Sequence, residues 1–123
     1  MAFNKQQKHD WYISKKALLV KRAKIWAENN PIKYKYSKYK RSARLRSLVF
    51  DLTLNEFSEI VSQPCFYCGE LQDACNGIDR VNNKCGYMKN NCVPCCKICN
   101  KMKGTMAKTE FIIKCQQINE VMF

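Results

Sequence analysis

The stretch that decides the fold begins with Cys65-Phe66-Tyr67-Cys68-Gly69 and ends with Cys96-Lys97-Ile98-Cys99-Asn100. Each end is a Cys-x-x-Cys pair, and the glycine after Cys68 is typical of the tight turn of a zinc knuckle. Two such pairs supply the four thiolates of a closed tetrahedral site, which leaves no position for water. The spacing therefore predicts one structural Zn²⁺, with the ligands Cys65, Cys68, Cys96 and Cys99.

An overlapping pair, Cys92-Val93-Pro94-Cys95, competes for the second half of this site. The adjacent Cys95 and Cys96 cannot readily serve one knuckle in the same way. Pro94 is typical of an irregular or edge β-segment and argues against a regular turn between two ligands, so we prefer Cys96 with Cys99. The remaining cysteines are expected to be small buried hydrophobic residues: Cys75, Cys85, Cys92, Cys95 and Cys115.

Length and composition limit the class of protein. The chain has 123 residues, 9 cysteines and a net charge of +12, which allows one ordinary domain plus an extension. We expect no signal peptide, because the first residues lack an apolar segment, and no membrane partner, because no uncharged run approaches about 20 residues. An odd number of cysteines, several in Cys-x-x-Cys pairs, favours metal over disulfides. The expected location is a reducing, intracellular compartment: the host cytoplasm or nucleus for a viral protein, the cytoplasm for a bacterial or phage protein.

Positive charge is concentrated in the first half of the chain. Residues 1–63 carry 14 basic and 5 acidic side chains, whereas residues 64–123 carry 8 and 5. Between Glu28 and Asp51 there is no acid, and tyrosines alternate with basic residues. This pattern favours nucleic acid over a membrane surface, because cations release phosphate counterions and tyrosines stack on bases. The expected phosphate contacts are Lys33, Lys35, Lys38, Lys40, Arg41, Arg44 and Arg46.

Helical periodicity and capping residues place the elements coarsely. Thr53 and Glu56 have the form of a capping box, which predicts a short helix that ends before Pro64. Ser37 is a favoured N-cap for a helix in the basic region. The expected elements are a helix over 11–28, a helix over 38–48, a strand over 48–52, the short helix after Thr53 and a final helix after Thr109.

Polar residues with catalytic potential lie around the cysteine pairs. Asp79 and Arg80 follow Asn76-Gly77-Ile78, Tyr87 follows a glycine, and Asn100 follows the last cysteine of the second pair. A hairpin can hold Asp79 against the first turn of a helix that bears Asn100. One carboxylate and one amide oxygen are hard ligands that suit Mg²⁺. They fill only part of its coordination sphere and leave positions for water and phosphate oxygens. Such an ion polarises a phosphodiester and stabilises its leaving oxygen.

These motifs together resemble the HNH endonucleases of the ββα-metal (His-Me finger) fold. The match covers residues 64–104: a knuckle, a strand ending in Asp-His or Asp-Arg, a loop with Gly-Tyr and Asn, and Cys-x-x-Cys-Asn opening a helix. The resemblance implies an α+β fold in which residues 48–123 form a zinc-stabilised nuclease domain with a C-terminal helix. Residues 1–47 would form a basic helical DNA-binding arm, similar to the arms of phage and viral members. The resemblance also implies that Asp79 and Asn100 bind the catalytic Mg²⁺, for which Mn²⁺ can substitute.

The sequence departs from the main family at position 80. Arg80 replaces the usual general-base histidine, and arginine cannot give up its proton in this pH range. A subgroup that includes some restriction endonucleases resembles this chain in having Asp-Arg with Gly-Tyr downstream. We therefore expect Tyr87 to activate water or to attack directly, with Arg80 bound to phosphate beside it. Lys101 and Lys103 are expected to contact phosphates.

The leading hypothesis is a Mg²⁺-dependent endonuclease or nickase that acts on duplex DNA. A cut through both strands would need a homodimer or two events. One alternative is a non-catalytic, zinc-finger-type nucleic-acid-binding protein derived from an HNH nuclease. An RNA-binding or ribosome-associated zinc protein also fits the charge.

Overall fold

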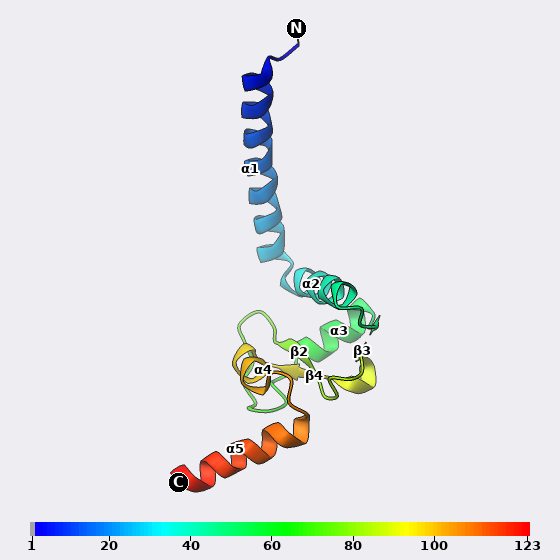
Figure 1. Ribbon diagram of the computed structural model, residues 1–123, viewed down its shortest axis with the longest axis vertical. Helices are drawn as coiled ribbons and strands as arrows, with labels where there is room; N and C mark the ends of the chain where they lie inside the picture. The colour runs from blue at the N-terminus through cyan, green and yellow to red at the C-terminus, as the bar shows by residue number, and fades with distance from the viewer. Residues whose placement is uncertain (1) are drawn as a thin grey trace. The chain divides into compact units, whose positions relative to one another are not determined.

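The computed structural model describes residues 2–123, which divide into a first unit ending at Pro31 and a second unit from Ile32 to Phe123 (Figure 1). The first unit consists of α1 (Lys5–Asn29). This helix begins before the expected residue 11, because Asn4 and Gln7 form a capping box: the Asn4 side chain accepts from the Gln7 N–H, and the Gln7 side chain accepts from the Asn4 N–H. Its side chains are exposed apart from Ala27, which is half-buried. None of the helices within residues 2–123 has the length and apolar composition needed to cross a membrane.

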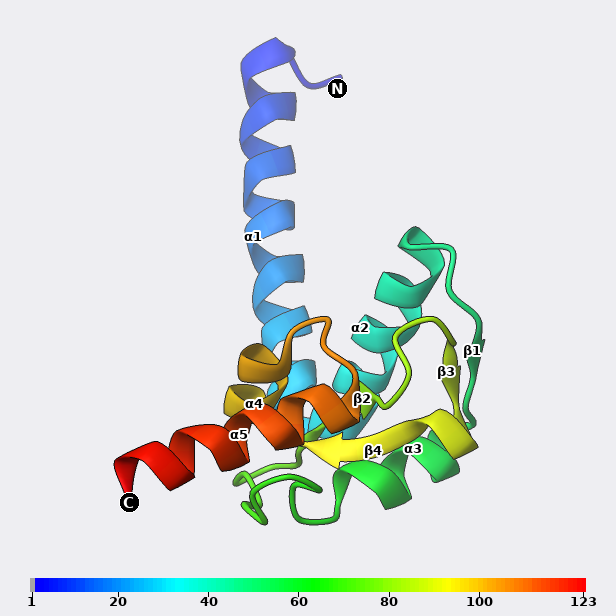
Figure 2. The ribbon, with the colours of Figure 1, turned by 60° about the horizontal axis from the view of Figure 1, so that its bottom comes forward.

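The second unit mixes helices with two short pairs of strands. β2 and β4 are antiparallel, β1 and β3 are parallel, and α4 follows β4 directly, which gives the ββα order. α3 packs against β2 and β4, and α4 packs against β2 (Figure 2). The elements of this unit, in chain order, are α2 (Pro31–Leu45), β1 (Phe50–Asp51), α3 (Leu54–Val61), β2 (Gly77–Arg80), β3 (Tyr87–Met88), the 3₁₀ turn η1 (Lys89–Asn91), β4 (Cys92–Cys95), α4 (Lys97–Lys103) and α5 (Lys108–Met122). The predicted α+β class is confirmed.

α2 begins earlier than expected. It begins at Pro31 and not at Lys38, because proline has no N–H to lose at the first helical position and its φ is already helical; Ser37 therefore lies inside the helix. Ile32, Tyr36 and Tyr39 pack against the hydrophobic core, so α2 belongs to the second unit. The compact units divide at residue 31, and the division into a DNA-binding arm over 1–47 and a nuclease domain over 48–123 stays a prediction.

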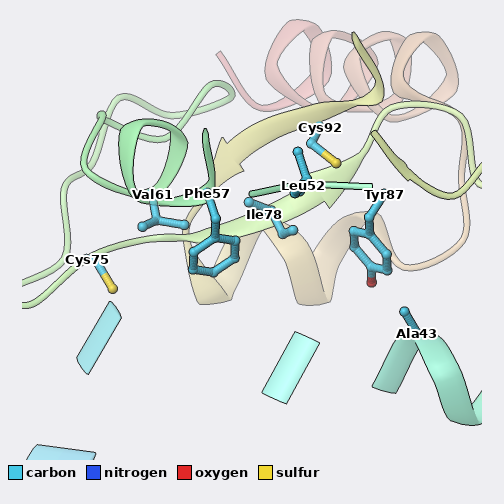
Figure 3. Close-up of a cluster of buried hydrophobic side chains, with 8 residues drawn as sticks. All are labelled: Ala43, Leu52, Phe57, Val61, Cys75, Ile78, Tyr87 and Cys92. Carbon is cyan, nitrogen blue, oxygen red and sulfur yellow. The ribbon is translucent and has the colours of Figure 1, made fainter. Parts of the chain in front are cut away.

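The hydrophobic core lies between α2, α3 and the strands. Figure 3 shows Phe57, Ile78 and Tyr87 projecting to the same side, toward Ala43 of α2. The Tyr39 ring packs against the rings of Phe57 and Tyr87, with centroids 5.8 and 5.9 Å away. These aromatic contacts join α2 to α3 and β3, and the Tyr39 hydroxyl accepts from the Ile78 N–H of β2, the strand that carries Asp79, at 3.2 Å.

Two other helices can be compared with what the sequence predicts. The capping box of α3 is confirmed: Thr53 Oγ1 accepts from the Glu56 N–H at 3.1 Å, and Glu56 Oε1 accepts from the Thr53 N–H at 3.0 Å. In α5 only Phe111 is buried, so the expected burial of Cys115 is wrong. Of the other cysteines expected in the interior, Cys85 is half-buried, and the rest are buried: Cys75, Cys92 and Cys95.

Candidate functional site

The four predicted zinc ligands meet in space. The Sγ atoms of Cys65, Cys68, Cys96 and Cys99 all lie within 4.8 Å of one another. A tetrahedral zinc with Zn–S bonds of about 2.3 Å requires sulfur atoms about 3.8 Å apart, and the Cys68 and Cys96 sulfurs are 3.7 Å apart. The donor set therefore fits a structural Zn²⁺, and the choice of Cys96 and Cys99 as the second pair agrees with this cluster.

Local backbone geometry explains why these thiols converge. Gly69 has φ +79°, a conformation that a residue with a side chain rarely adopts, and its N–H bonds back to the Cys65 carbonyl at 2.8 Å. Cys96 is the N-cap of α4, and its Sγ accepts from the Cys99 N–H at 3.3 Å. Burial acts to raise the pKa of Cys65, but backbone hydrogen bonds from Cys96, Cys68 and Tyr67 outweigh it and lower the pKa to about 6. Cys65 therefore favours the thiolate that a metal needs, whereas burial raises the pKa of Cys99 in the same cluster.

The competing pair is unsuited to zinc. Cys92 lies opposite Arg80 at the other end of the β2–β4 pair from Cys95, which lies opposite Gly77. Neither cysteine belongs to the cluster of four thiols described above, and burial raises the pKa of Cys92 to about 11 and that of Cys95 still further. The Cys95 thiol donates to the Cys96 carbonyl, at 3.4 Å.

A cleft of about 860 Å³ lies beside the ββα elements, and α2 and α4 contribute to its walls. Asp79 is the one acidic residue among the residues that line it. Six cationic side chains line the same cleft: Lys35, Lys38, Arg46, Arg80, Lys97 and Lys101. The wall is therefore strongly positive around a single carboxylate, which is an arrangement suited to a polyanion.

The Asp79 side chain is held from two directions. It projects from β2, where Asp79 pairs with Val93 of β4, and it is 4% exposed. Oδ2 accepts from Tyr67 Oη at 2.7 Å, and Oδ1 accepts from Lys103 Nζ at 3.2 Å. The structure corrects the expected phosphate contact of Lys103, because this side chain is 1% exposed and forms an ion pair with Asp79.

Asn100 and Lys101 lie where the sequence indicates, on the helix opened by the second cysteine pair. Asn100 is half-buried on α4 and lines the same cleft as Asp79. Lys101 is exposed and also lines this cleft. The structure thus brings the expected carboxylate and amide to one cavity, with a cation beside them.

Arg80 and Tyr87 adopt a different arrangement from the expected one. Arg80 Nη1 donates to the carbonyls of Asn83 and Cys85, both at 2.8 Å, and its guanidinium lies 5.3 Å from the centre of the Tyr87 ring. The Tyr87 hydroxyl accepts instead from Arg46 Nη2, at 2.8 Å. Both tyrosine and arginines line the cleft, but Arg46 is the cation at the phenol oxygen.

Two tyrosines, Tyr39 and Tyr67, contact β2 in a way that the sequence did not predict. Tyr39 Oη accepts from the Ile78 N–H at 3.2 Å and lies 3.4 Å from its carbonyl, and a Cβ added at Gly77 would collide with this hydroxyl. Burial raises the pKa of Tyr39 to about 12, so the phenol stays protonated. Burial and the hydrogen bond to Asp79 raise the pKa of Tyr67 far above its usual value, so Tyr67 remains a donor. Each acts on β2 from a distant segment, and spacing alone gives no signal for such contacts.

The basic residues of α2 divide into two groups. Lys35, Lys38 and Arg46 line the cleft. Lys35 also donates to the Cys75 carbonyl, at 3.1 Å. The other expected phosphate contacts are exposed but do not belong to the cleft lining: Lys33, Lys40, Arg41 and Arg44.

Comparisons with known proteins give two related sequences. A protein of Acanthamoeba polyphaga mimivirus, R423, is 44% identical over 85 residues, which cover 68% of this chain and 16% of that protein. The SPbeta prophage-derived protein YoqL of Bacillus subtilis (strain 168), named as a candidate HNH endonuclease, is 27% identical over 103 residues. That match covers 74% of this chain and 45% of YoqL, so the chain spans less than half the length of either relative. No protein-family model matches the chain.

A solved structure shares the fold. The rare-cutting HNH restriction endonuclease PacI aligns with a TM-score of 0.58 at 19% sequence identity, over 73% of this chain and 78% of PacI. This match confirms the α+β fold with its ββα elements that was expected from the sequence, and the four-cysteine cluster could hold a metal ion in it.

Proposed function

We propose that this chain, whose fold is that of the HNH endonucleases, is a Mg²⁺-dependent DNA endonuclease that hydrolyses phosphodiester bonds in the cleft. One observation carries the proposal: a single carboxylate, Asp79, lies in a wall that otherwise presents six cationic side chains. The cations suit a phosphate backbone, and the carboxylate suits a divalent metal ion.

Asp79 and Asn100 would hold the metal ion, with Mn²⁺ able to replace Mg²⁺. Each carboxylate oxygen of Asp79 has two acceptor positions, so one hydrogen bond from Tyr67 or Lys103 leaves the other for a metal. The Asn100 amide oxygen is a second hard donor on the same cleft. When bound, the ion supplies charge stabilisation at the scissile phosphate and its leaving oxygen.

The remaining residues of the cleft would bind and orient the backbone. Lys97 and Lys101 of α4 and Lys38 of α2 are exposed cations on the cleft wall. The first unit would add to this grip, because α1 carries 7 basic and 2 acidic side chains. We propose duplex DNA as the substrate, nicked by one chain and cut through both strands by a homodimer or two events. A reducing, intracellular compartment would keep the zinc ligands as thiols.

Tyr87 would orient or activate the attacking group. Arg46 donates to its oxygen, which leaves the tyrosine O–H to donate to water or to a phosphate oxygen. Tyr87→Phe is expected to lower kcat for plasmid nicking by about 10²-fold or more, the usual range for losing a proton-transfer group. Zinc content and DNA affinity should stay at wild-type values.

Tyr36→Phe is the matched control, since the Tyr36 hydroxyl donates to the Leu52 carbonyl and Tyr36 does not line the cleft. It should nick at the wild-type rate. A Tyr87→Phe enzyme with an unchanged rate would remove Tyr87 from the mechanism.

The cleft wall of α2 gives a matched test of DNA binding. Lys38 and Lys40 are both exposed, and each ammonium lies over a tyrosine ring, but only Lys38 lines the cleft. Lys38→Ala should weaken binding to any duplex and lower the slope of log K against log salt by about 1. Lys40→Ala should leave the slope within error of wild type. Equal effects in fluorescence anisotropy titrations over a salt series would locate binding outside the cleft.

A non-catalytic zinc-finger-type binding protein is the second candidate, favoured by one observation. Arg80 replaces the family's base, and its Nη1 is committed to two carbonyls. Binding that survives in the Asp79 variants, together with no cleavage by the wild type, would support this candidate. An RNA-binding protein would show tighter binding to RNA than to DNA at the same salt concentration.

A further inference from the structure

The most unusual feature next to the proposed metal site is the buried lysine. Lys103 is 1% exposed at the end of α4, and its Nζ lies 3.2 Å from Asp79 Oδ1 and 3.3 Å from the Arg80 carbonyl. Lysine is almost never fully buried unless it is paired. Its neighbour Lys101, on the same helix, is exposed.

Because the pair of Lys103 and Asp79 is buried, it affects both the stability of the metal-free protein and the binding of a metal ion. A carboxylate that is 4% exposed is costly without a compensating charge, and so is a fully buried ammonium. Lys103 supplies that compensation when no metal is present. The same positive charge repels a divalent cation that approaches Asp79 and occupies one acceptor position on Oδ1.

We infer that Lys103 is the resident counter-ion of Asp79: it stabilises the buried carboxylate in the metal-free protein and thereby weakens divalent-metal binding at this site. The inference rests on the proposed function, in which Asp79 is a metal ligand. Lys103 is a positioning residue, because it acts through Asp79 and does not line the cleft.

This role has two effects of opposite sign. Without Lys103, the metal-free protein should be less stable, because Asp79 loses its partner. The affinity for Mn²⁺ should rise, because no cation competes for the carboxylate. A lysine that only packed the interior would, when replaced, lower stability without tightening metal binding.

The test uses zinc-loaded full-length protein without DNA and measures free Mn²⁺ by electron paramagnetic resonance. Lys103→Met is expected to bind Mn²⁺ at least about tenfold more tightly than wild type and to gain a larger rise in Tm on adding Mn²⁺. Lys103→Gln keeps an N–H donor for the Arg80 carbonyl without the charge, and it should show the same direction if the methionine variant does not fold. Lys114→Met, which removes an exposed charge that does not line the cleft, should change the affinity less than threefold.

The outcomes distinguish a failure of the counter-ion role of Lys103 from a failure of the proposed metal site. Mn²⁺ binding that is equal or weaker in the Lys103 variants, with wild type and Lys114→Met binding normally, overturns the counter-ion role and leaves the proposed function standing. Wild-type binding of Mn²⁺ that is unchanged by Asp79→Ala contradicts the proposed metal site, and so does an absence of binding by every variant. In either of these cases the counter-ion role falls with the metal site.

Discussion

Asp79→Asn is expected to lower the rate of plasmid nicking by about 10³-fold or more while DNA binding persists. Asparagine keeps the shape of the side chain but loses the charge that would hold Mg²⁺. The substitution also leaves Lys103 buried without its partner, at a cost of about 3–5 kcal/mol in the free energy of unfolding. The nicking rate must therefore be measured well below the Tm of the variant, with circular dichroism to confirm the fold.

The double variant Asp79→Asn/Lys103→Met is the control for stability. It removes both charges of the pair, so it should regain much of the lost stability and remain inactive. Asn100→Ala should lower nicking as well, because the Asn100 amide lines the same cleft. Wild-type nicking by a folded Asp79→Asn protein would show that Asp79 is not a metal ligand of the reaction.

Loss of zinc is expected to unfold the part of the chain that carries the site. Structural zinc contributes about 10–16 kcal/mol in small zinc-finger peptides, which is comparable to the whole stability of an ordinary domain, about 5–15 kcal/mol. Cys96 is both a proposed ligand and the N-cap of α4, and Tyr67, between the ligands Cys65 and Cys68, bonds to Asp79. Removing the metal would therefore release α4 and the Asp79 side chain together.

Elemental analysis should find one zinc per chain in the wild type and none after Cys96→Ser or treatment with a strong chelator. The cooperative thermal transition should be lost with the metal. Cys115→Ser, which changes an exposed thiol outside the cluster, should retain both zinc and Tm. A wild-type protein that folds with zinc content near zero would overturn the zinc assignment.

Features defined by short spacings were predictable from the sequence. The two Cys-x-x-Cys pairs, the Thr53 capping box and the helix that carries Asn100 each depend on contacts within a few residues. The placement of Asp79 and Asn100 on one cleft followed from a hairpin leading into that helix. Local geometry therefore predicted the frame of the site.

Contacts between distant segments were not predictable. Arg46 and Tyr87 are 41 residues apart, and Lys103 reaches Asp79 across 24 residues. A basic residue near a phosphate site is normally exposed, so nothing in the sequence separates Lys103 from Lys101.

The most direct measurement is the conversion of supercoiled plasmid by purified wild-type protein with Mg²⁺, in parallel with EDTA and with Asp79→Asn. The proposed function predicts open-circular product with Mg²⁺ or Mn²⁺, and no product in the other two reactions. If the zinc-loaded, folded wild type leaves supercoiled plasmid, linear duplex and branched DNA intact with both metals, the chain is not a DNA endonuclease.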